Sequence, residues 1–233
     1  MDQLPPRPHD QRSAPVSTFS PLSQYLNSII LGDCCSVMQQ FPNNSADLVL
    51  TDPPYLINYQ SRDGHNIAGD VNDAWLIPAF TEAYRVLKSG GFCISFYGWS
   101  KADRYLAAWR KAGFRPVGHI VLIKSYTSGS GFLQYQHEQA YLLAKGRVDY
   151  PLFPISDVLH WKYTGNRLHP TQKPIRALIR LVRAFSHPGD IVLDPFCGSG
   201  SVPLAAKLSG RHYIGIEVRQ DYCEVAQQRL RSS

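Results

Sequence analysis

The feature of this sequence that most constrains its fold is an alternation of short apolar runs with helical patterns from about residue 28 to the C-terminus. Seven runs have the length and side chains of buried strands: 29–31, 48–50, 92–97, 120–123, 140–144, 191–193 and 213–216. Such an alternation is typical of a mostly parallel sheet with helices on both faces. The expected class is therefore α/β, with a Rossmann-like sheet of seven strands.

Helices are expected over 76–87, 105–112, 174–185 and 220–231, where apolar residues recur at helical spacing. Glycines follow the first two patterns, at Gly90-Gly91 and at Gly113, and glycine commonly ends a helix. The fourth and fifth strands are separated only by residues 125–138, which is too short for a crossover helix. We therefore expect one strand of the sheet to run antiparallel to its neighbours.

The composition of the chain indicates how many domains it can form and what kind of partner it favours. The chain has 233 residues, of which 44% are hydrophobic, enough for one full core. Residues 1–24 are rich in proline and polar side chains and are expected to form a disordered leader, with a single domain over 25–233. A net charge of +6 favours a polyanionic partner.

Cysteine and histidine usage indicates neither disulfides nor a metal site. The five cysteines include no C-x-x-C pair, and the eight histidines lack the spacing of metal ligands. No apolar run approaches the length of about 18 residues that a membrane span requires. These features favour a cytoplasmic protein with no membrane association.

Asp52-Pro53-Pro54-Tyr55 directly follows the second predicted strand. Each proline fixes its own φ and disfavours a helical conformation in the preceding residue, so the chain leaves the strand stiff and extended. An acceptor carboxylate, a backbone carbonyl and an aromatic face then lie side by side. This arrangement suits a planar group that carries an NH2, although a Pro-Pro turn with a solvated Asp52 and a packing Tyr55 is the structural alternative.

A glycine-containing loop, Asp194-Pro195-Phe196-Cys197-Gly198-Ser199-Gly200, follows the sixth predicted strand and precedes a helix. Ligands of open α/β sheets bind outside the carboxyl ends of the strands, and glycine lets the backbone approach them closely. Glu217 ends the next strand, where a carboxylate can hold ribose hydroxyls. Pro203 stands where a dinucleotide fingerprint has its third glycine, so another adenosine ligand is favoured.

These two motifs together resemble those of the amino-directed DNA methyltransferases, which methylate exocyclic nitrogens of adenine or cytosine with S-adenosyl-L-methionine. Their order along the chain is that of the β-class, which implies a class I methyltransferase fold with permuted motifs. Ile30-Leu31-Gly32-Asp33-Cys34 and His169-Pro170-Thr171-Gln172-Lys173-Pro174 extend the resemblance. It covers residue 26 to the C-terminus.

The resemblance implies a role for each matching residue. Asp52, Pro53, Pro54 and Tyr55 would form the catalytic motif. The cofactor would contact Asp33, Cys34, Asp52, Thr171, Lys173, Asp194, Phe196, Cys197, Gly198, Ser199, Gly200 and Glu217. Cys197 has no evident His or acidic partner and is assigned no nucleophilic role.

The expected function is DNA adenine N6-methylation of a flipped-out base, since family members with Asp first in the catalytic motif mostly act on adenine. Cytosine N4-methylation is an alternative. RNA or protein-amide N-methylation is another, although those families more often place Asn first and the cofactor loop before the catalytic motif. An inactive nucleic-acid-binding subunit is a third, against which the intact motifs argue.

A small target-recognition region is expected around 125–168. Only about 23 residues separate Lys145 from His169, which favours a short or relaxed DNA target. The resemblance also implies that a homodimer or a partner restriction enzyme can accompany the protein. Arg176, Arg180 and Arg183 share one helical face, which could follow DNA phosphates or simply be solvated. The loop 58–72 could touch DNA or act as a lid.

Overall fold

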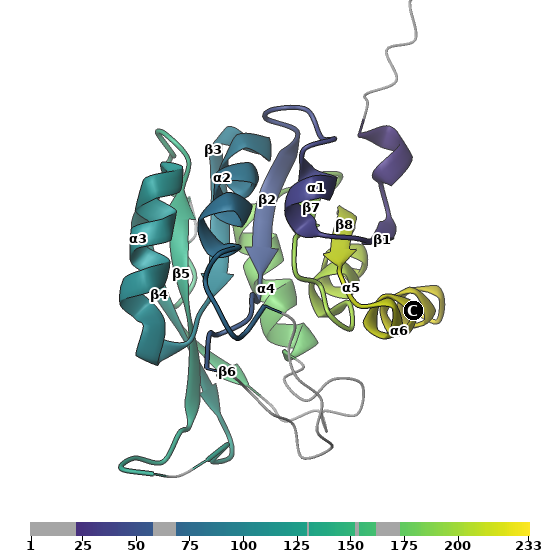
Figure 1. Ribbon diagram of the computed structural model, residues 1–233. Coiled ribbons are helices and arrows are strands. Elements are labelled where there is room, and N and C mark those ends of the chain that lie inside the picture. Colours follow the sequence, from purple (N-terminus) through teal and green to yellow (C-terminus); the bar gives the residue numbers. More distant parts are fainter. Residues whose placement is uncertain (1–21, 58–68, 130, 152–153, 162–172) are drawn as a thin grey trace, which may run out of the picture.

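The computed structural model describes residues 22–57, 69–129, 131–151, 154–161 and 173–233 (Figure 1). In this part of the chain a single sheet contains eight strands: β1 (Ser28–Leu31), β2 (Ala46–Thr51), β3 (Leu87–Phe96), β4 (Arg115–Lys124), β5 (His137–Ala144), β6 (Val158–Trp161), β7 (Ile191–Asp194) and β8 (His212–Glu217). Their order across the sheet is β1-β8-β7-β2-β3-β5-β4-β6. The α/β architecture expected from the sequence is confirmed.

One strand, β5, runs against its neighbours. It pairs antiparallel with both β3 and β4, whereas every other pair in the sheet is parallel. The expected reversed strand is therefore confirmed, but the expected count of seven strands is wrong. The additional strand is β6, a four-residue edge strand parallel to β4. Its alternating burial involves only Leu159 and Trp161, which is too short a pattern to identify in the sequence.

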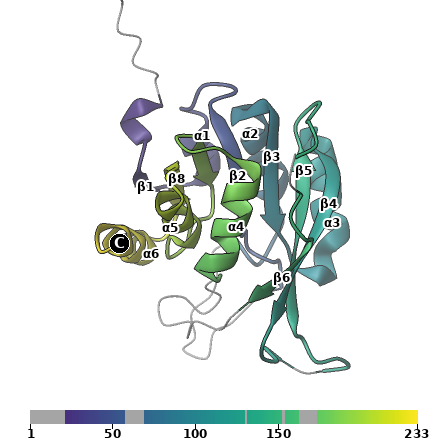
Figure 2. The ribbon, with the colours of Figure 1, turned by 180° about the vertical axis from the view of Figure 1, so that it is seen from behind.

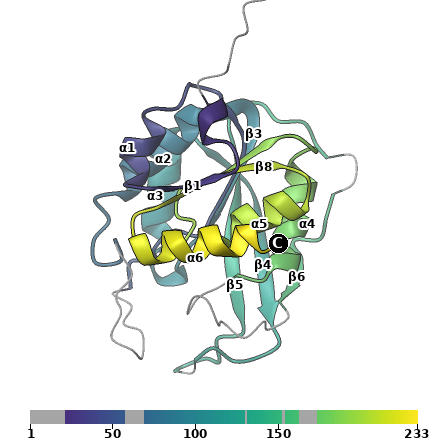
Figure 3. The ribbon, with the colours of Figure 1, turned by 90° about the vertical axis from the view of Figure 1, so that its right-hand side faces the viewer.

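Helices cover both faces of this sheet (Figures 1 and 2). Their bounds are α1 (Cys34–Met38), α2 (Leu76–Val86), α3 (Ala102–Ala112), α4 (Ile175–Phe185), α5 (Ser201–Leu208) and α6 (Gln220–Arg231). Buried side chains of α1, α2 and α3 pack in one hydrophobic cluster, and those of α4, α5 and α6 pack in the other. Viewed from the side, α1, α2 and α3 lie on one side of the sheet, and α4 and α5 lie on the other (Figure 3). None of the helices in the described residues is both long and apolar enough to cross a bilayer.

Two departures from the boundaries expected from the sequence concern the end of α2 and the start of the domain. Helix α2 ends at Val86, because Leu87 is already extended and begins β3, so the pair Gly90-Gly91 lies inside a strand. At the start of the domain, Leu22 is buried and residues Ser23–Tyr25 form a 3-10 helix, η1. Ordered packing therefore begins before residue 25, while the rest of the expected leader lies outside the described residues. The predicted end of α3 is confirmed by Gly113, which has a φ of 106°.

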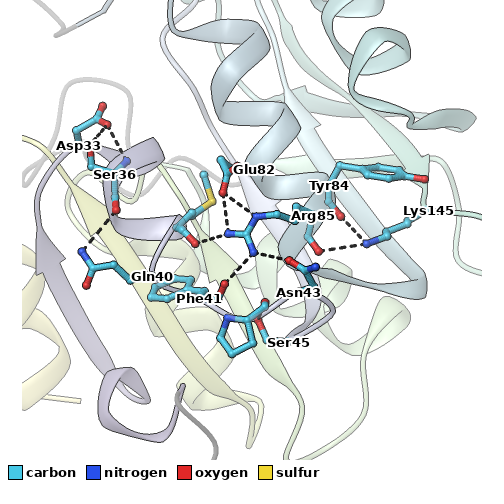
Figure 4. Close-up of polar contacts among 12 residues, drawn as sticks. Asp33, Ser36, Gln40, Phe41, Asn43, Ser45, Glu82, Tyr84, Arg85 and Lys145 are labelled. Atoms are coloured by element: carbon cyan, nitrogen blue, oxygen red, sulfur yellow. Dashed lines mark hydrogen bonds and ion pairs between the residues drawn. The ribbon is translucent and has the colours of Figure 1, made fainter.

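Two cations, Arg85 and Lys145, bind backbone carbonyls around the end of α2 (Figure 4). Arg85 donates hydrogen bonds to the backbone carbonyls of Met38 and Phe41, which lie in and just after α1. Lys145 is only 8% exposed, and its Nζ lies 2.7 Å from the Tyr84 carbonyl and 2.6 Å from the Leu87 carbonyl. A cation at this position satisfies the carbonyls that the end of a helix leaves without intrahelical partners. Lys145 directly follows β5, so its hydrogen bonds hold the carboxyl end of α2 beside the end of that strand.

Replacing Lys145 with Met should lower the free energy of unfolding by about 2 to 4 kcal/mol, because it leaves buried carbonyls without donors. Urea denaturation measures this change. The same substitution at the exposed Lys111 of α3 is the matched control and should change stability by less than about 0.5 kcal/mol. Equal effects at the two positions would show that Lys145 does not hold α2.

Candidate active site

A pocket of about 300 Å³ opens at the carboxyl ends of β1, β2, β7 and β8. These strands are parallel neighbours, so their carboxyl ends meet at one edge of the sheet. After β2 the chain continues to β3 on one side, whereas after β7 it continues to β8 on the other. The pocket lies at this divergence, which is where open α/β sheets bind their ligands.

Most residues predicted from the sequence line this pocket. They are Asp33, Cys34, Asp52, Pro53, Pro54, Tyr55, Lys173, Asp194, Phe196, Cys197, Gly198, Ser199 and Glu217. Gly200 does not line it. Gly200 is the N-cap residue of α5 and has a φ of 78°. A Cβ there would lie 2.9 Å from the Cβ of Ala226, so close packing against α6 explains why this residue is a glycine. Thr171 lies outside the described residues.

Asp52 is bound on both of its carboxylate oxygens. Lys173 Nζ lies 2.6 Å from Oδ2, and the Tyr55 hydroxyl lies 3.0 Å from Oδ1. Burial raises the pKa of Asp52 above its ordinary value, and the charge of Lys173 together with these hydrogen bonds opposes that rise only in part. The Asp52 side chain remains 22% exposed, so it is accessible from the pocket. The solvated carboxylate of the structural alternative is thus not what the fold contains.

The rest of the tetrapeptide is held by neighbouring elements. Tyr105, a buried residue of α3, donates its hydroxyl to the carbonyl of Pro54. Gly98 contacts the backbone of Tyr55, and a Cβ at Gly98 would lie 2.9 Å from both the carbonyl oxygen and the Cβ of Tyr55. Leu56 then turns the chain with a φ of 60°, a conformation that is costly for a residue of this size. The segment from Pro54 to Tyr55 is therefore held in place by contacts with other elements.

On the other side of the pocket, two carboxyl groups organise the loop after β7. Asp194 Oδ1 accepts hydrogen bonds from Thr51 Oγ1 at 2.9 Å and from the backbone N–H of Phe196 at 3.2 Å. Burial raises the pKa of Asp194 to about 8. Glu217 Oε2 accepts from the Gly198 N–H at 2.9 Å, which fixes the glycine loop against the end of β8. Thr51 immediately precedes Asp52, so the Asp194 contact joins the two predicted motifs directly.

Sequence and fold comparisons agree with this geometry. Residues 46–228 match the model of the N6/N4 family described as DNA methylase. The chain belongs to the N6/N4 DNA methylase family. This methyltransferase is 54% identical to the Escherichia coli K12 protein named "Putative methylase YubD", over 88% of the chain and 90% of YubD.

Two further curated relatives are more distant. DNA adenine methyltransferase YhdJ of Escherichia coli K12 is 30% identical, with 87% of this chain and 82% of YhdJ covered. Type II methyltransferase M.HinfI of Haemophilus influenzae is 28% identical, with 90% of this chain and 70% of M.HinfI covered.

The fold is shared with solved methyltransferases. The M1.HpyAVI–SAM complex superposes with a TM-score of 0.70 at 22% identity, covering 87% of this chain and 98% of that one. The cytosine-N4-specific PvuII DNA methyltransferase superposes with a TM-score of 0.71 at 18% identity, covering 87% and 85%. These similarities confirm the class I methyltransferase fold.

Several residues at the site of the methyltransferase were not identified from the sequence. Glu138 at the start of β5 accepts a hydrogen bond from the Tyr55 hydroxyl at 3.1 Å, and Lys124 at the end of β4 forms an ion pair with Glu138. Trp75 packs edge-on against Phe196, with ring centroids 5.0 Å apart, and both rings line the pocket. The signal that could have identified them is a charged residue on each strand beside the hairpin loop, Lys124 at the end of β4 and Glu138 near the start of β5.

The thiols of the site do not resemble nucleophiles. Burial and the nearby Asp194 and Glu217 carboxyl groups raise the pKa of Cys197 well above its ordinary value. Cys34 and Cys35 lie beside Asp33, with their ligand atoms within 4.8 Å of one another. However, Asp33 Oδ1 already accepts a hydrogen bond from the Ser36 N–H at the start of α1. We therefore assign neither a nucleophile nor a metal to this group.

The raised pKa of Asp194 predicts a pH dependence of stability. A carboxyl group with a higher pKa in the folded state binds more protons there than when unfolded, so stability falls as pH rises from about 4 towards 8. Relative to Asp194→Asn, the wild type should lose up to about 1.4 kcal/mol per pH unit in this window.

Urea denaturation of both proteins without cofactor, between pH 5 and 9, measures this difference. Asp103→Asn, at an exposed position on α3, controls for the loss of a carboxylate elsewhere. Parallel pH profiles for the wild type and Asp194→Asn would contradict the prediction.

Proposed function

We propose that the protein is a DNA adenine N6-methyltransferase that uses S-adenosyl-L-methionine as methyl donor. The observation that carries this proposal is the Asp52 carboxylate beside the Tyr55 ring, at the edge of a pocket that also contains the glycine loop after β7. Family membership supplies the class of reaction, and the 30% identical relative named as a DNA adenine methyltransferase supports adenine as the target.

The composition of the pocket fits the proposed cofactor. S-adenosyl-L-methionine, when bound, supplies an electrophilic methyl group on a positively charged sulfur. Glu217, Asp33 and Cys34 line the pocket. The Glu217 carboxylate would accept hydrogen bonds from ribose hydroxyls, and Asp33 and Cys34 would border the adenine end. The rings of Trp75 and Phe196 offer faces that stabilise a cation. Thr171 and Lys173 are the residues proposed for the methionine end.

The opposite edge of the pocket suits the target amine. The lone pair of an aromatic NH2 is delocalised into the ring, so the nitrogen is a poor nucleophile. Hydrogen bonds from the NH2 to Asp52 and to the Pro53 carbonyl would turn the nitrogen towards tetrahedral geometry and aim its lone pair at the methyl group. Stacking on Tyr55 would offset part of the cost of flipping the base out of the duplex. Asp52 need only accept hydrogen bonds, because the nitrogen loses its proton readily once it is alkylated.

Cytosine N4-methylation is the second candidate. Cytosine presents the same kind of aromatic NH2, and the cytosine-N4-specific PvuII enzyme shares this fold with a TM-score of 0.71. The adenine assignment therefore rests on the named adenine-specific relative and on Asp as the first residue of the catalytic motif. The homodimer and the partner restriction enzyme stay predictions.

The function is tested by incubating the protein with labelled S-adenosyl-L-methionine and, separately, duplex DNA, RNA and protein. Nucleosides from the DNA are then analysed by mass spectrometry. We expect label in DNA, as N6-methyladenine. N4-methylcytosine would contradict the choice of base, and label only in RNA or protein would contradict the proposal as a whole.

Replacing Asp52 with Ala should lower the rate of transfer at least about a hundredfold, because the amine loses its acceptor. Calorimetry should show that binding of S-adenosyl-L-methionine is largely retained. Asp103→Ala, which removes an exposed carboxylate from α3, should leave transfer unchanged. An active Asp52→Ala enzyme would refute the role given to this carboxylate.

A further inference from the structure

Each carboxylate oxygen of Asp52 already accepts a hydrogen bond from a neighbouring side chain. Lys173 Nζ lies 2.6 Å from Oδ2, and the Tyr55 hydroxyl lies 3.0 Å from Oδ1. An incoming amine must share an oxygen with one of these donors or replace it. Lys173 is an ammonium only 5% exposed, and its departure would leave two buried charges unpaired. Displacing the Tyr55 hydroxyl from Asp52 therefore costs less free energy than displacing Lys173.

Tyr55 has one proton and two acceptors for it. Its hydroxyl oxygen lies 3.0 Å from Asp52 Oδ1 and 3.1 Å from Glu138 Oε2, and a phenol donates only one hydrogen bond at a time. Burial and the two carboxylates raise the pKa of Tyr55 well above its ordinary value, so the proton stays on the phenol. Rotation about the C–O bond redirects this proton without moving the aromatic ring.

Glu138 is fixed as an acceptor by groups outside the catalytic motif. Lys124, which is 5% exposed, forms an ion pair with Glu138 Oε1 and also donates to Ser128 Oγ at 3.1 Å. Burial alone would raise the pKa of Glu138, but the charges of Lys173 and Lys124 and the hydrogen bonds from Lys124 and Tyr55 hold it below the ordinary value. Glu138 is therefore an ionised acceptor built on the paired strands β4 and β5.

We propose that Glu138 is a positioning residue for methyl transfer, the acceptor to which the Tyr55 hydroxyl turns when the target amine takes Asp52 Oδ1. This inference rests on the proposed function, because it assigns Asp52 to the amine. The exchange conserves hydrogen bonds: the phenol keeps a charged acceptor, Lys173 keeps Asp52, and the amine gains an oxygen that it need not share. Without Glu138 the phenol would compete with the substrate for Asp52.

A double-mutant cycle separates this role from simple structural support. Glu138→Gln keeps the shape of the side chain and an oxygen for Lys124, but it turns an NH2 donor instead of an acceptor towards the Tyr55 hydroxyl. Single-turnover transfer should therefore slow about tenfold. Tyr55→Phe removes the competing hydroxyl and keeps the stacking ring, so it should retain at least about a tenth of the wild-type rate. In the Tyr55→Phe background, Glu138→Gln should change the rate less than about twofold.

Two outcomes would overturn the proposal. If Glu138→Gln slows transfer equally in the wild type and in Tyr55→Phe, Glu138 supports the structure of the site and does not act by accepting the Tyr55 proton. If Tyr55→Phe is inactive although it binds S-adenosyl-L-methionine, the hydroxyl has a role of its own. Glu224→Gln, an exposed position on α6, is the matched control and should transfer normally. Absence of transfer by the wild type would contradict the proposed function itself, whereas additive losses in an active enzyme contradict only the role of Glu138.

Discussion

The site is organised by a buried ion pair, Asp52 with Lys173, at the carboxyl end of the central strand β2. An isolated carboxylate in a largely desolvated position would neutralise by taking up a proton. The ammonium of Lys173 opposes this, and it lies 5.3 Å from the centroid of the Tyr55 ring and 4.9 Å from that of Phe96. The pair therefore keeps an acceptor charged in a pocket whose walls are mainly apolar. This is the environment in which a fixed acceptor acts most strongly on a substrate.

The order of the strands explains how motifs about 140 residues apart form one site. Strand β2 pairs directly with β7, so Thr51 and Asp194 meet through a 2.9 Å hydrogen bond. Asp52 and the glycine loop then face the same pocket from adjacent strand ends. A chain in which the Asp52 motif precedes the glycine loop thus needs only this one parallel pairing to bring the two motifs together. The permuted order of the motifs along the chain does not change the arrangement of the site, because that arrangement depends on where the strands lie in the sheet.

Sequence patterns identified the parts of the molecule that depend on neighbours along the chain. The bounds of α6, the left-handed Gly113 after α3 and the reversed strand of the hairpin all follow from local spacing and loop length. The end of α2 did not, because Leu87 is drawn into β3 by pairing with Ala46, a contact that no local pattern contains. The edge strand β6 was missed for a related reason, since four residues are too few to show a period.

The same distinction applies to the site. The sequence pointed to the pocket residues of the Asp52–Tyr55 segment and of the glycine loop because each motif is contiguous. Glu138, Lys124 and Tyr105 lie on other elements, and their contacts with the tetrapeptide or with one another form only in the fold. Their roles depend on tertiary contacts that spacing does not encode. Gly200 illustrates the opposite case: its place in a recognisable motif suggested ligand contact, whereas packing against Ala226 accounts for it.

The central claim is that Asp52 acts as an ionised acceptor whose charge Lys173 maintains. The most direct measurement is the single-turnover rate of methyl transfer to DNA against pH, between about 4.5 and 8, for the wild type and Lys173→Met at saturating cofactor. Because burial raises the pKa of Asp52, the wild-type rate should fall in acid at a pH above the ordinary range of an aspartate. Loss of the Lys173 charge should raise that pKa further and move the fall to higher pH. A rate that is independent of pH in both proteins, or an acid limb that Lys173→Met does not displace, would contradict the account.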